Sequence, residues 1–166
     1  PPRPTQRRHL PPSCAVSLGQ VSPPASLLVH REAGHKNIYG TLDVDPSSRI
    51  LWTDPNQVRQ ILINLLTNAV QATAEQGRIT IQTRRSSKGV ILSVCDNGIG
   101  IPKQDLDKIF EPFFSTKAPK DGTGLGLYVT REIVAKLGGT IEVDSRLGCG
   151  TRFDITMPDQ KSLTTD

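Results

Sequence analysis

The sequence predicts an α+β fold, a two-layer α/β sandwich in which a mixed sheet carries its helices on one face. Three observations predict this fold. Two long stretches, 54–73 and 124–137, repeat apolar residues with a helical period. Segments that alternate apolar and polar residues like strands lie before, between and after them. Short turn sequences join consecutive strand segments, so we expect hairpins at both ends of the domain, and no internal repeat is visible.

Three regions are expected along the chain. Residues 1–24 form a linker or connector arm, because seven of the 13 prolines fall within the first 26 residues. Residues 25–158 form the folded domain, and residues 159–166 form a disordered tail. Besides the two long helices, the domain is expected to contain a short helix over 25–36, strands over 38–45 and 49–53 around a turn at 45–48, strands over 78–85 and 90–95, a short helix over 103–109, and strands over 140–144 and 151–157.

The composition is that of a globular α/β domain with a basic arm. The formal net charge is +4, and residues 1–36 carry five basic residues and one acidic residue, whereas the rest has 15 of each. A nucleic-acid-binding face on the folded part is therefore not expected. The three cysteines show neither metal-ligand spacing nor a disulfide framework, which fits a reducing compartment. Because no apolar run could span a membrane and the chain begins at Pro, we expect an excised cytoplasmic domain, whose parent protein could be anchored in the inner membrane.

The helix predicted over 54–73 is the segment around which the rest of the chain is organised. Asp54 can cap its first turn, Pro55 suits the first helical position, and Gln57 completes a capping-box-like pair. A core stripe at helical spacing is formed by Val58, Ile61, Leu62, Leu65, Ala69 and Ala72. A narrow strip of amides remains: Gln57, Gln60, Asn64, Asn68 and Gln71. Such a strip either faces a ligand or is buried and hydrogen bonded to backbone, and the helix alone favours neither.

Two of these amides have the chemistry of a metal ligand. Asn64 and Asn68 are four residues apart, hence on one helical face. Amide oxygens can ligate Mg²⁺, which keeps several waters and binds jointly with phosphate oxygens. Neither residue is a glutamate, so a base that activates water is missing at this place. The pattern favours transfer of a phosphoryl group to an acceptor other than water.

Two glycine-punctuated loops lie at the ends of predicted elements. The loop at 122–127 opens the second long helix, where open amides and close backbone approach favour an anion such as phosphate. Its spacing matches neither a Walker nor a dinucleotide-binding motif, and a plain tight turn is the alternative. In the loop at 96–102, Asp96 can accept a hydrogen bond from the amino group of adenine, which favours ATP over GTP. The alternative there is an Asx-turn around Asp96 or Asn97.

Together these motifs resemble the nucleotide-binding boxes of sensor histidine kinases. In chain order, Asn64–Ala69 resembles the N box, Asp96–Gly100 the first glycine box, Phe110–Phe114 the F box and Gly122–Leu127 the second glycine box. Four boxes in this order and at these spacings are highly specific, and the resemblance covers about residues 25–158. It implies the Bergerat ATP-binding fold, shared with gyrase and the MutL mismatch-repair ATPases. The arm is similar to the connector of nitrogen-regulation-type sensors.

The resemblance implies a role for each matching residue. Asn68 would ligate Mg²⁺, and Asn64 would lie beside it near the phosphates and the attacking nucleophile, as the catalytic position. Asp96 would bind the adenine amino group, with Thr151 backing the base. The other implied ATP-binding positions are Gly98, Gly100 and Ile101 at the adenine pocket, Gly122, Thr123, Gly124, Leu125, Gly126 and Leu127 around the phosphates, and Phe110, Phe114 and Lys117 at a lid, together with Gln71 on the long helix.

The position of Gln71 departs from the family pattern. Many members carry Lys or Arg there, and Gln71 supplies no charge, so more of the contact with phosphate could fall on Lys117 or Lys120. The lid between Phe114 and Gly122 is expected to be poorly ordered without nucleotide.

The implied function is that of the catalytic ATP-binding domain of a two-component sensor histidine kinase, with ATP and Mg²⁺ as cofactors. None of the histidines, His9, His30 and His35, has the family's phospho-acceptor context. The γ-phosphoryl group would therefore pass to a histidine of the protein's own dimerisation domain, and then to a response regulator. The full-length protein would be a homodimer and this chain a monomer. The alternatives are a Bergerat ATPase, an anti-sigma-type serine kinase, and a degenerate module that binds no nucleotide.

Overall fold

The computed structural model describes residues 14–17, 36–116 and 122–159. Several expectations fall outside these ranges: the short helix over 25–36 except Lys36, the lid residues Lys117 and Lys120, all three histidines, and residues 160–166 of the tail. Within the described ranges, no helix is long and apolar enough to cross a bilayer.

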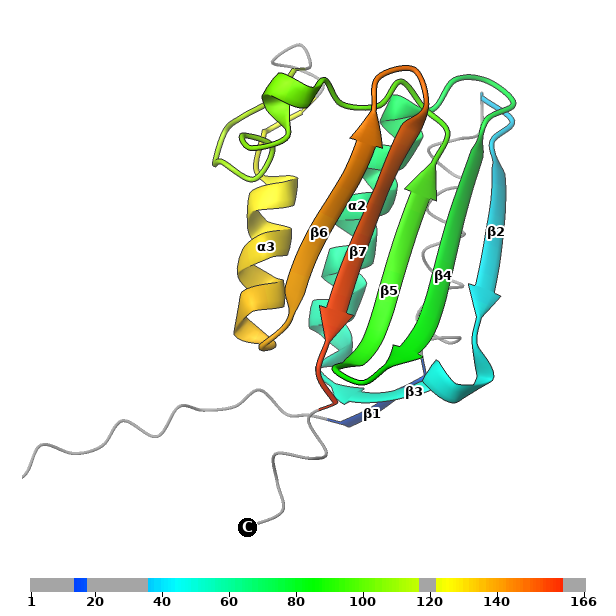
Figure 1. Ribbon diagram of the computed structural model, residues 1–166, viewed down its shortest axis with the longest axis vertical. Helices are drawn as coiled ribbons and strands as arrows, with labels where there is room; N and C mark the ends of the chain where they lie inside the picture. The colour runs from blue at the N-terminus through cyan, green and yellow to red at the C-terminus, as the bar shows by residue number, and fades with distance from the viewer. Residues whose placement is uncertain (1–13, 18–35, 117–121, 160–166) are drawn as a thin grey trace, which may run out of the picture.

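Five strands form one mixed sheet in the order β2-β4-β5-β7-β6 (Figure 1). Their bounds are β2 Tyr39–Val44, β4 Arg78–Ser86, β5 Gly89–Asp96, β6 Thr140–Arg146 and β7 Gly150–Met157. β2 runs parallel to β4, and all other neighbours are antiparallel. The predicted hairpins β4–β5 and β6–β7 are confirmed, and each of their strands is longer than predicted by one or two residues.

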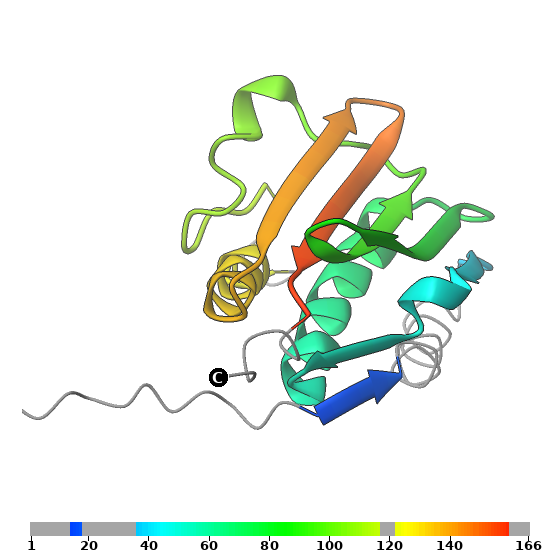
Figure 2. The ribbon, with the colours of Figure 1, turned by 60° about the horizontal axis from the view of Figure 1, so that its bottom comes forward.

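Two helices, α2 (Pro55–Ala72) and α3 (Gly126–Lys136), cover one face of this sheet (Figures 1 and 2). The core lies between the two layers. It joins the apolar stripe of α2 to the inward positions of the strands, Ile79, Ile81, Val90, Leu92, Val94, Phe153, Ile155 and Met157. The predicted α+β sandwich with helices on one face is therefore confirmed.

The long helix α2 forms where its local signals predict it. The Asp54 carboxylate accepts a hydrogen bond from the N–H of Asn56 at 2.9 Å, and Pro55 is the first helical residue. The buried stripe contains the predicted residues except Ala72, which is half-buried, and it adds Leu66 and Val70. At the other end, Lys36 Nζ donates to the carbonyls of Val70 and Thr73 at 3.2 and 3.1 Å, which satisfies acceptors that the helix leaves open.

The two other helical predictions need correction. α3 begins at Gly126 rather than 124, because Gly124 has a φ of +67°, outside the helical region. It ends at Lys136, one residue before the predicted end, and the predicted stop at Gly138, with φ +76°, is confirmed. The segment 103–109 forms only the single 3₁₀ turn η2 (Lys103–Asp105), followed by further turns. Ile109 is its only fully buried apolar residue, so a longer helix would have little face to bury.

The hairpin predicted over 38–53 is wrong. β3 (Ile50–Thr53) does not pair with β2 but with β1 (Cys14–Ser17), in a separate two-stranded antiparallel sheet beside the start of α2 (Figure 2). The turn between β2 and β3 is the 3₁₀ turn η1 (Pro46–Ser48), in which the buried Ser48 hydroxyl lies 2.7 Å from the Thr83 hydroxyl of β4. This contact holds the chain against the end of the sheet and directs β3 out of it. β1 lies within the expected connector arm, where the sequence pattern predicts no strand.

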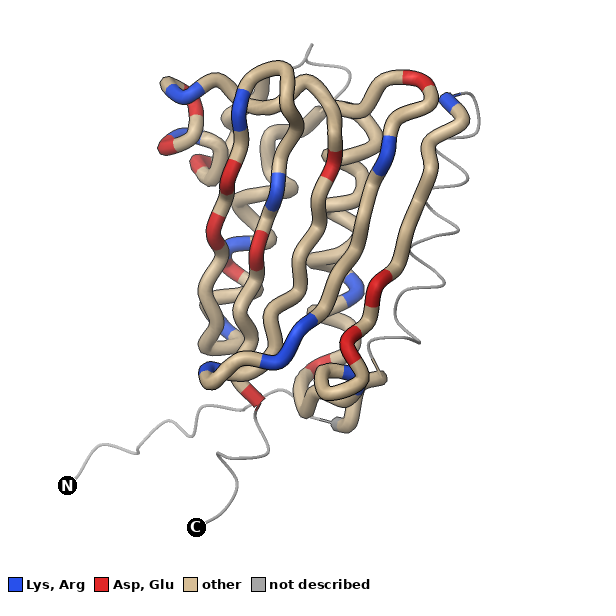
Figure 3. Tube along the Cα trace, turned by 45° about the vertical axis from the view of Figure 1, so that its right-hand side comes forward, with Lys and Arg blue, Asp and Glu red and all other residues tan. Residues whose placement is uncertain are grey.

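The outer face of the sheet is polar. Lys and Arg positions alternate with Asp and Glu positions along the strands of the sheet (Figure 3). Across β5 and β7, Arg152 Nε donates to both carboxylate oxygens of Asp154 at 2.9 Å, and Ser93 Oγ donates to the same carboxylate. Burial alone would raise the pKa of Asp154, but the hydrogen bonds from Arg152 and Ser93 outweigh it and hold that pKa below its ordinary value.

Candidate nucleotide site

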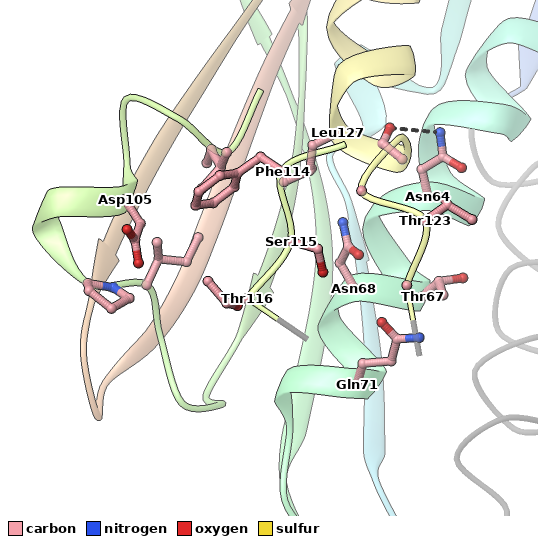
Figure 4. Close-up of a pocket in the computed structure, with 16 residues that line it drawn as sticks. Asn64, Thr67, Asn68, Gln71, Asp105, Phe114, Ser115, Thr116, Thr123 and Leu127 are labelled. Carbon is pink, nitrogen blue, oxygen red and sulfur yellow. Dashed lines mark hydrogen bonds between the residues drawn. The ribbon is translucent and has the colours of Figure 1, made fainter. Parts of the chain in front are cut away.

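A cavity of about 280 Å³ lies between α2, the start of α3 and the loops that follow β5 (Figure 4). Its walls come from three segments of the chain. The lining residues are Asn64, Thr67, Asn68 and Gln71 of α2, Ile101, Pro102, Asp105, Ile109, Phe114, Ser115 and Thr116 of the middle loops, and Gly122, Thr123, Gly124, Gly126 and Leu127 at α3.

The amide strip of α2 forms one wall of this cavity, and its two asparagines differ. Asn68 points across the cavity toward Ser115 (Figure 4), and no residue in the described part of the chain hydrogen bonds to its carboxamide. Asn64 instead points toward α3, where its Nδ2 donates to the carbonyl of Gly126 at 3.1 Å and to the Thr130 hydroxyl at 3.2 Å. Asn64 is thus hydrogen bonded within the protein, as one of the two interpretations of the strip predicts, whereas the carboxamide of Asn68 faces the cavity.

The start of α3 is the opposite wall. Gly124, with φ +67°, lies so close to Phe113 that an added Cβ would come within 2.5 Å of the Phe113 carbonyl carbon. Glycine is required there by the protein itself. At Gly126, among the residues that the structure describes, an added Cβ would meet only the Asn64 Cβ, at 4.0 Å. Packing within the protein thus does not require a glycine at 126, whereas a ligand approaching the helix start would.

Asp96, at the end of β5, lies beneath the loop at 97–101. Its Oδ1 accepts a hydrogen bond from the N–H of Gly98 at 2.8 Å, which is the Asx-turn that the sequence leaves open. The turn engages one carboxylate oxygen. Burial raises the pKa of Asp96, and hydrogen bonds from the backbone of Gly98 and Thr151 partly offset that rise. A half-buried carboxylate of this kind fits a site that accepts a hydrogen bond from a ligand.

The loop at 97–101 is tied to its surroundings along its whole length. The N–H of Ile99 donates to the carbonyl of Ala72 at 3.0 Å, and the N–H of Gly148 donates to the carbonyl of Ile99 at 2.7 Å. The N–H of Ile101 donates to the Ser145 hydroxyl at 2.8 Å. The loop is thus held between the end of α2 and the β6–β7 hairpin.

The predicted ATP-binding residues fall into two groups. Those that line the cavity are Asn64, Asn68, Gln71, Ile101, Phe114, Gly122, Thr123, Gly124, Gly126 and Leu127. Those that do not are Asp96, Gly98, Gly100, Phe110, Leu125 and Thr151. Phe110 packs edge-on against Phe153, with ring centroids 6.4 Å apart, so it belongs to the core edge rather than to the cavity wall.

Six lining residues are not among the predicted ATP-binding residues: Thr67, Pro102, Asp105, Ile109, Ser115 and Thr116. Thr67 lies between Asn64 and Gln71 on the same strip of α2, so helical spacing could have found it. The others lie in loops or in the short turns around η2, where no sustained period predicts the direction of a side chain.

Comparisons with known proteins agree with this geometry. The family described as "Histidine kinase-, DNA gyrase B-, and HSP90-like ATPase" matches residues 53–161. The sensor histidine kinase ZraS of Klebsiella oxytoca is 40% identical over 145 residues, which are 87% of this chain and 31% of that protein. The chain thus spans about a third of the length of this curated relative.

Solved structures of histidine kinases have the same fold. The nucleotide-free catalytic domain of histidine kinase ThkA superposes with a TM-score of 0.78 at 32% identity, over 89% of this chain and 95% of that one. ThkA in complex with the response regulator TrrA matches with a TM-score of 0.74 at 30% identity, over 89% of this chain and 42% of that one. Full-length ShkA in complex with AMPPNP matches with a TM-score of 0.78 at 30% identity, over 88% and 31%.

Family match, fold and cavity agree: Asn68 and the glycine-lined start of α3 line one cavity in a sheet-and-helix sandwich of the kinase type, and Ile101, in the loop that follows the half-buried Asp96, lines it as well. The chain therefore belongs to the histidine kinase-, DNA gyrase B- and HSP90-like ATPase family, as a catalytic domain of the histidine kinase type.

Proposed function

We propose that this chain binds Mg-ATP and donates the γ-phosphoryl group to a histidine in another part of a longer sensor kinase. The observation that carries the proposal is the cavity itself, in which Asn68 of α2 faces the open start of α3. A helix start with free N–H groups attracts phosphate, and a carboxamide oxygen beside it suits a cation that shares the phosphates.

In this proposal the base lies on the side of Asp96 and the phosphates on the side of α3. The half-buried Asp96 carboxylate accepts a hydrogen bond from the adenine amino group, and Ile101 covers the base. Gly122, Gly124 and Gly126 present backbone N–H groups to the phosphates, with Thr123 and Leu127 beside them. Gln71, near the C-terminal end of α2, lines the cavity and offers a hydrogen-bond donor without a charge. Lys117, outside the described residues, remains a candidate for the missing charge.

The residues present fit Mg²⁺ held jointly with phosphate. Asn68 offers a carboxamide oxygen that no described residue occupies. Within the described ranges, no three His, Cys, Asp or Glu side chains gather, so a cage made only of protein ligands is not the arrangement proposed. When bound, the cation would neutralise charge that develops on the transferred phosphoryl group.

Asn64 supports the reaction through its position. Its carboxamide hydrogen bonds to the Gly126 carbonyl and the Thr130 hydroxyl of α3. These bonds fix α2, which carries the proposed Mg²⁺ ligand, relative to α3, whose start faces the phosphates. Catalysis of this kind depends on alignment more than on covalent chemistry by the protein. Activation of water would need a glutamate at this position. Because the residue is Asn64, transfer of the phosphoryl group is favoured over hydrolysis.

The partners follow from the length of the relatives. ZraS extends well beyond the matched region, and ThkA was solved with a response regulator. We propose that the parent protein supplies a dimerisation domain with the phospho-acceptor histidine, acts as a homodimer, and passes the phosphoryl group to a response regulator. The chain alone would be a monomer.

The first test is calorimetric titration of the chain with ATP, with and without Mg²⁺, and with GTP. We expect ATP to bind more tightly than GTP, with affinity that depends on Mg²⁺. Asp96→Asn should weaken ATP binding about 100-fold, and Asn68→Ala should abolish the dependence on Mg²⁺. Asp154→Asn and Asn56→Ala make the same chemical changes on β7 and α2 outside the cavity and should bind normally. Equal binding by all four variants would contradict the assignment.

A second test separates kinase from ATPase. The chain is incubated with γ-labelled ATP, alone and with a separately produced dimerisation domain of the parent protein. We expect little release of phosphate by the chain alone and labelling of the added domain. Rapid hydrolysis by the chain alone would favour the gyrase-like alternative instead.

A further inference from the structure

A row of three polar side chains crosses the end of the sheet beside the cavity. Asp96 on β5 pairs with Thr151 on β7, and Thr151 pairs with Ser145 on β6. Residues directly opposite in antiparallel strands lie on the same face. Thr151 is buried in alternation with Phe153 and Ile155, so the row lies on the helix side of the sheet. The sequence motifs single out Asp96 and Thr151, but not Ser145.

The hydroxyl of Ser145 connects this row to the cavity wall. Its oxygen accepts a hydrogen bond from the N–H of Ile101 at 2.8 Å, and Ile101 lines the cavity. The same hydroxyl lies 2.8 Å from the carbonyl of Gly150 and 2.9 Å from the Thr151 hydroxyl. A hydroxyl donates once and accepts twice, so these contacts use its capacity within the protein.

A polar residue at this place stands out within β6. The preceding inward positions on the strand are Ile141 and Val143, which pack against the core. A hydroxyl among them is stable only because the three partners satisfy it. Ile101 lies in the loop that borders the proposed base site, and Gly150 and Thr151 lie at the start of β7 beside it. None of the three partners belongs to the rest of the core.

We propose that Ser145 is a positioning residue for the base of the nucleotide. It holds Ile101 and Thr151 at a set position relative to Asp96 before the ligand binds. This inference rests on the proposed function, because it takes the Asp96 side of the cavity as the base site. Removing the hydroxyl leaves the Ile101 N–H without its acceptor, while Gly98 and Ile99 keep theirs. Nucleotide binding must then order the Ile101 end of the loop, which lowers the affinity. The amino group of the base is also aligned less accurately with the Asp96 carboxylate.

The test compares Ser145→Ala with Ser145→Thr, which keeps the hydroxyl, and with Ser93→Ala. Ser93 is a matched control, since it is a hydrogen-bonded serine of the same sheet, bonded to Asp154 on the outer face. Each protein is titrated with ATP and with purine riboside triphosphate, which lacks the 6-amino group, at a temperature where circular dichroism shows all to be folded. The ratio of the two affinities reports alignment of the amino group with Asp96.

We expect Ser145→Ala to bind ATP about tenfold more weakly and to lose most of the preference for ATP over the analogue. Ser145→Thr and Ser93→Ala should keep the preference. If Ser145→Ala weakens both ligands by the same factor, or neither, the inference is wrong while the proposed function stands. If the unsubstituted chain binds no ATP, or does not prefer it to the analogue, the proposed function fails first.

Hydrogen exchange of the ligand-free chain gives an independent measurement. In Ser145→Ala the Ile101 amide should exchange about tenfold faster or more, because its acceptor is gone, while the Gly98 amide exchanges as before. An unchanged Ile101 rate would contradict the role of Ser145 directly, without any nucleotide.

Discussion

Gly126→Ala should separate the needs of the fold from the needs of the ligand. Gly126 is the first residue of α3 and lines the cavity. Of the described part of the chain, a Cβ there would meet only the Asn64 Cβ, at 4.0 Å, which is ordinary contact. Since alanine is a better helix former than glycine, the free energy of unfolding should stay the same or rise by up to about 1 kcal/mol.

The same methyl group should hinder the ligand. It would occupy space at the helix start, where phosphate oxygens must come within hydrogen-bond distance of backbone N–H groups. Losing or lengthening one such charge-assisted bond costs about 1.5–3 kcal/mol, so ATP should bind about 10- to 100-fold more weakly. Urea unfolding measures the stability, and calorimetric titration with Mg-ATP measures the affinity.

Gly124→Ala is the matched control and should behave in the opposite way. Its φ of +67° and the 2.5 Å approach of a Cβ to the Phe113 carbonyl carbon predict a loss of stability of about 1–2 kcal/mol or more. If Gly126→Ala proves as destabilising as Gly124→Ala, the helix start is packed more tightly than the structure indicates. If Gly126→Ala binds ATP normally, the phosphates do not lie at α3.

Three further predictions concern stability. Asn64→Ala and Thr130→Val should each lower the free energy of unfolding by about 1 kcal/mol. Both substitutions remove the same hydrogen bond, of 3.2 Å, so the double variant should lose less than the sum of the two single losses. Losses that add strictly in urea unfolding would contradict this hydrogen bond. Asp96 and Asp154 should change the free energy of unfolding with pH in opposite directions. Because the pKa of Asp96 is raised in the folded state, the stabilisation from its carboxyl group falls as pH rises above the ordinary Asp range. Because the pKa of Asp154 is lowered, the stabilisation from its carboxylate is lost as pH falls through that range. Thermal unfolding of Asp96→Asn and Asp154→Asn between about pH 3 and 7 should show slopes changed in opposite directions, and a common direction would refute the assignment. Val16→Ala should cost about 2 kcal/mol if β1 is an integral part of the fold, since Val16 is only 3% exposed; an unchanged melting temperature would mean that the arm does not pack there.

Local chemistry predicts α2 and the two C-terminal hairpins well. The cap at Asp54, the proline at the first helical position and the apolar period all act within a few residues of one another, so a sequence window contains the whole signal. The same holds for the stop of α3 at Gly138. The partner of β2 could not be found this way. β2 pairs with β4 across the whole of α2, and the contact that turns the chain out of the sheet joins Ser48 to Thr83.

Residue types and their spacing predict the candidates for a nucleotide site: the amides of α2, the carboxylate at the end of β5 and the glycines before α3. Only the packed fold places these candidates relative to one another. It left the Asn68 carboxamide open to the cavity and tied Asn64 to Gly126, 62 positions away along the chain. It also brought Ser145 into line with Thr151 and Asp96 through strand register. Residue types and local periods report chemistry and secondary structure, whereas hydrogen-bond partners depend on which distant segments the packed core brings together.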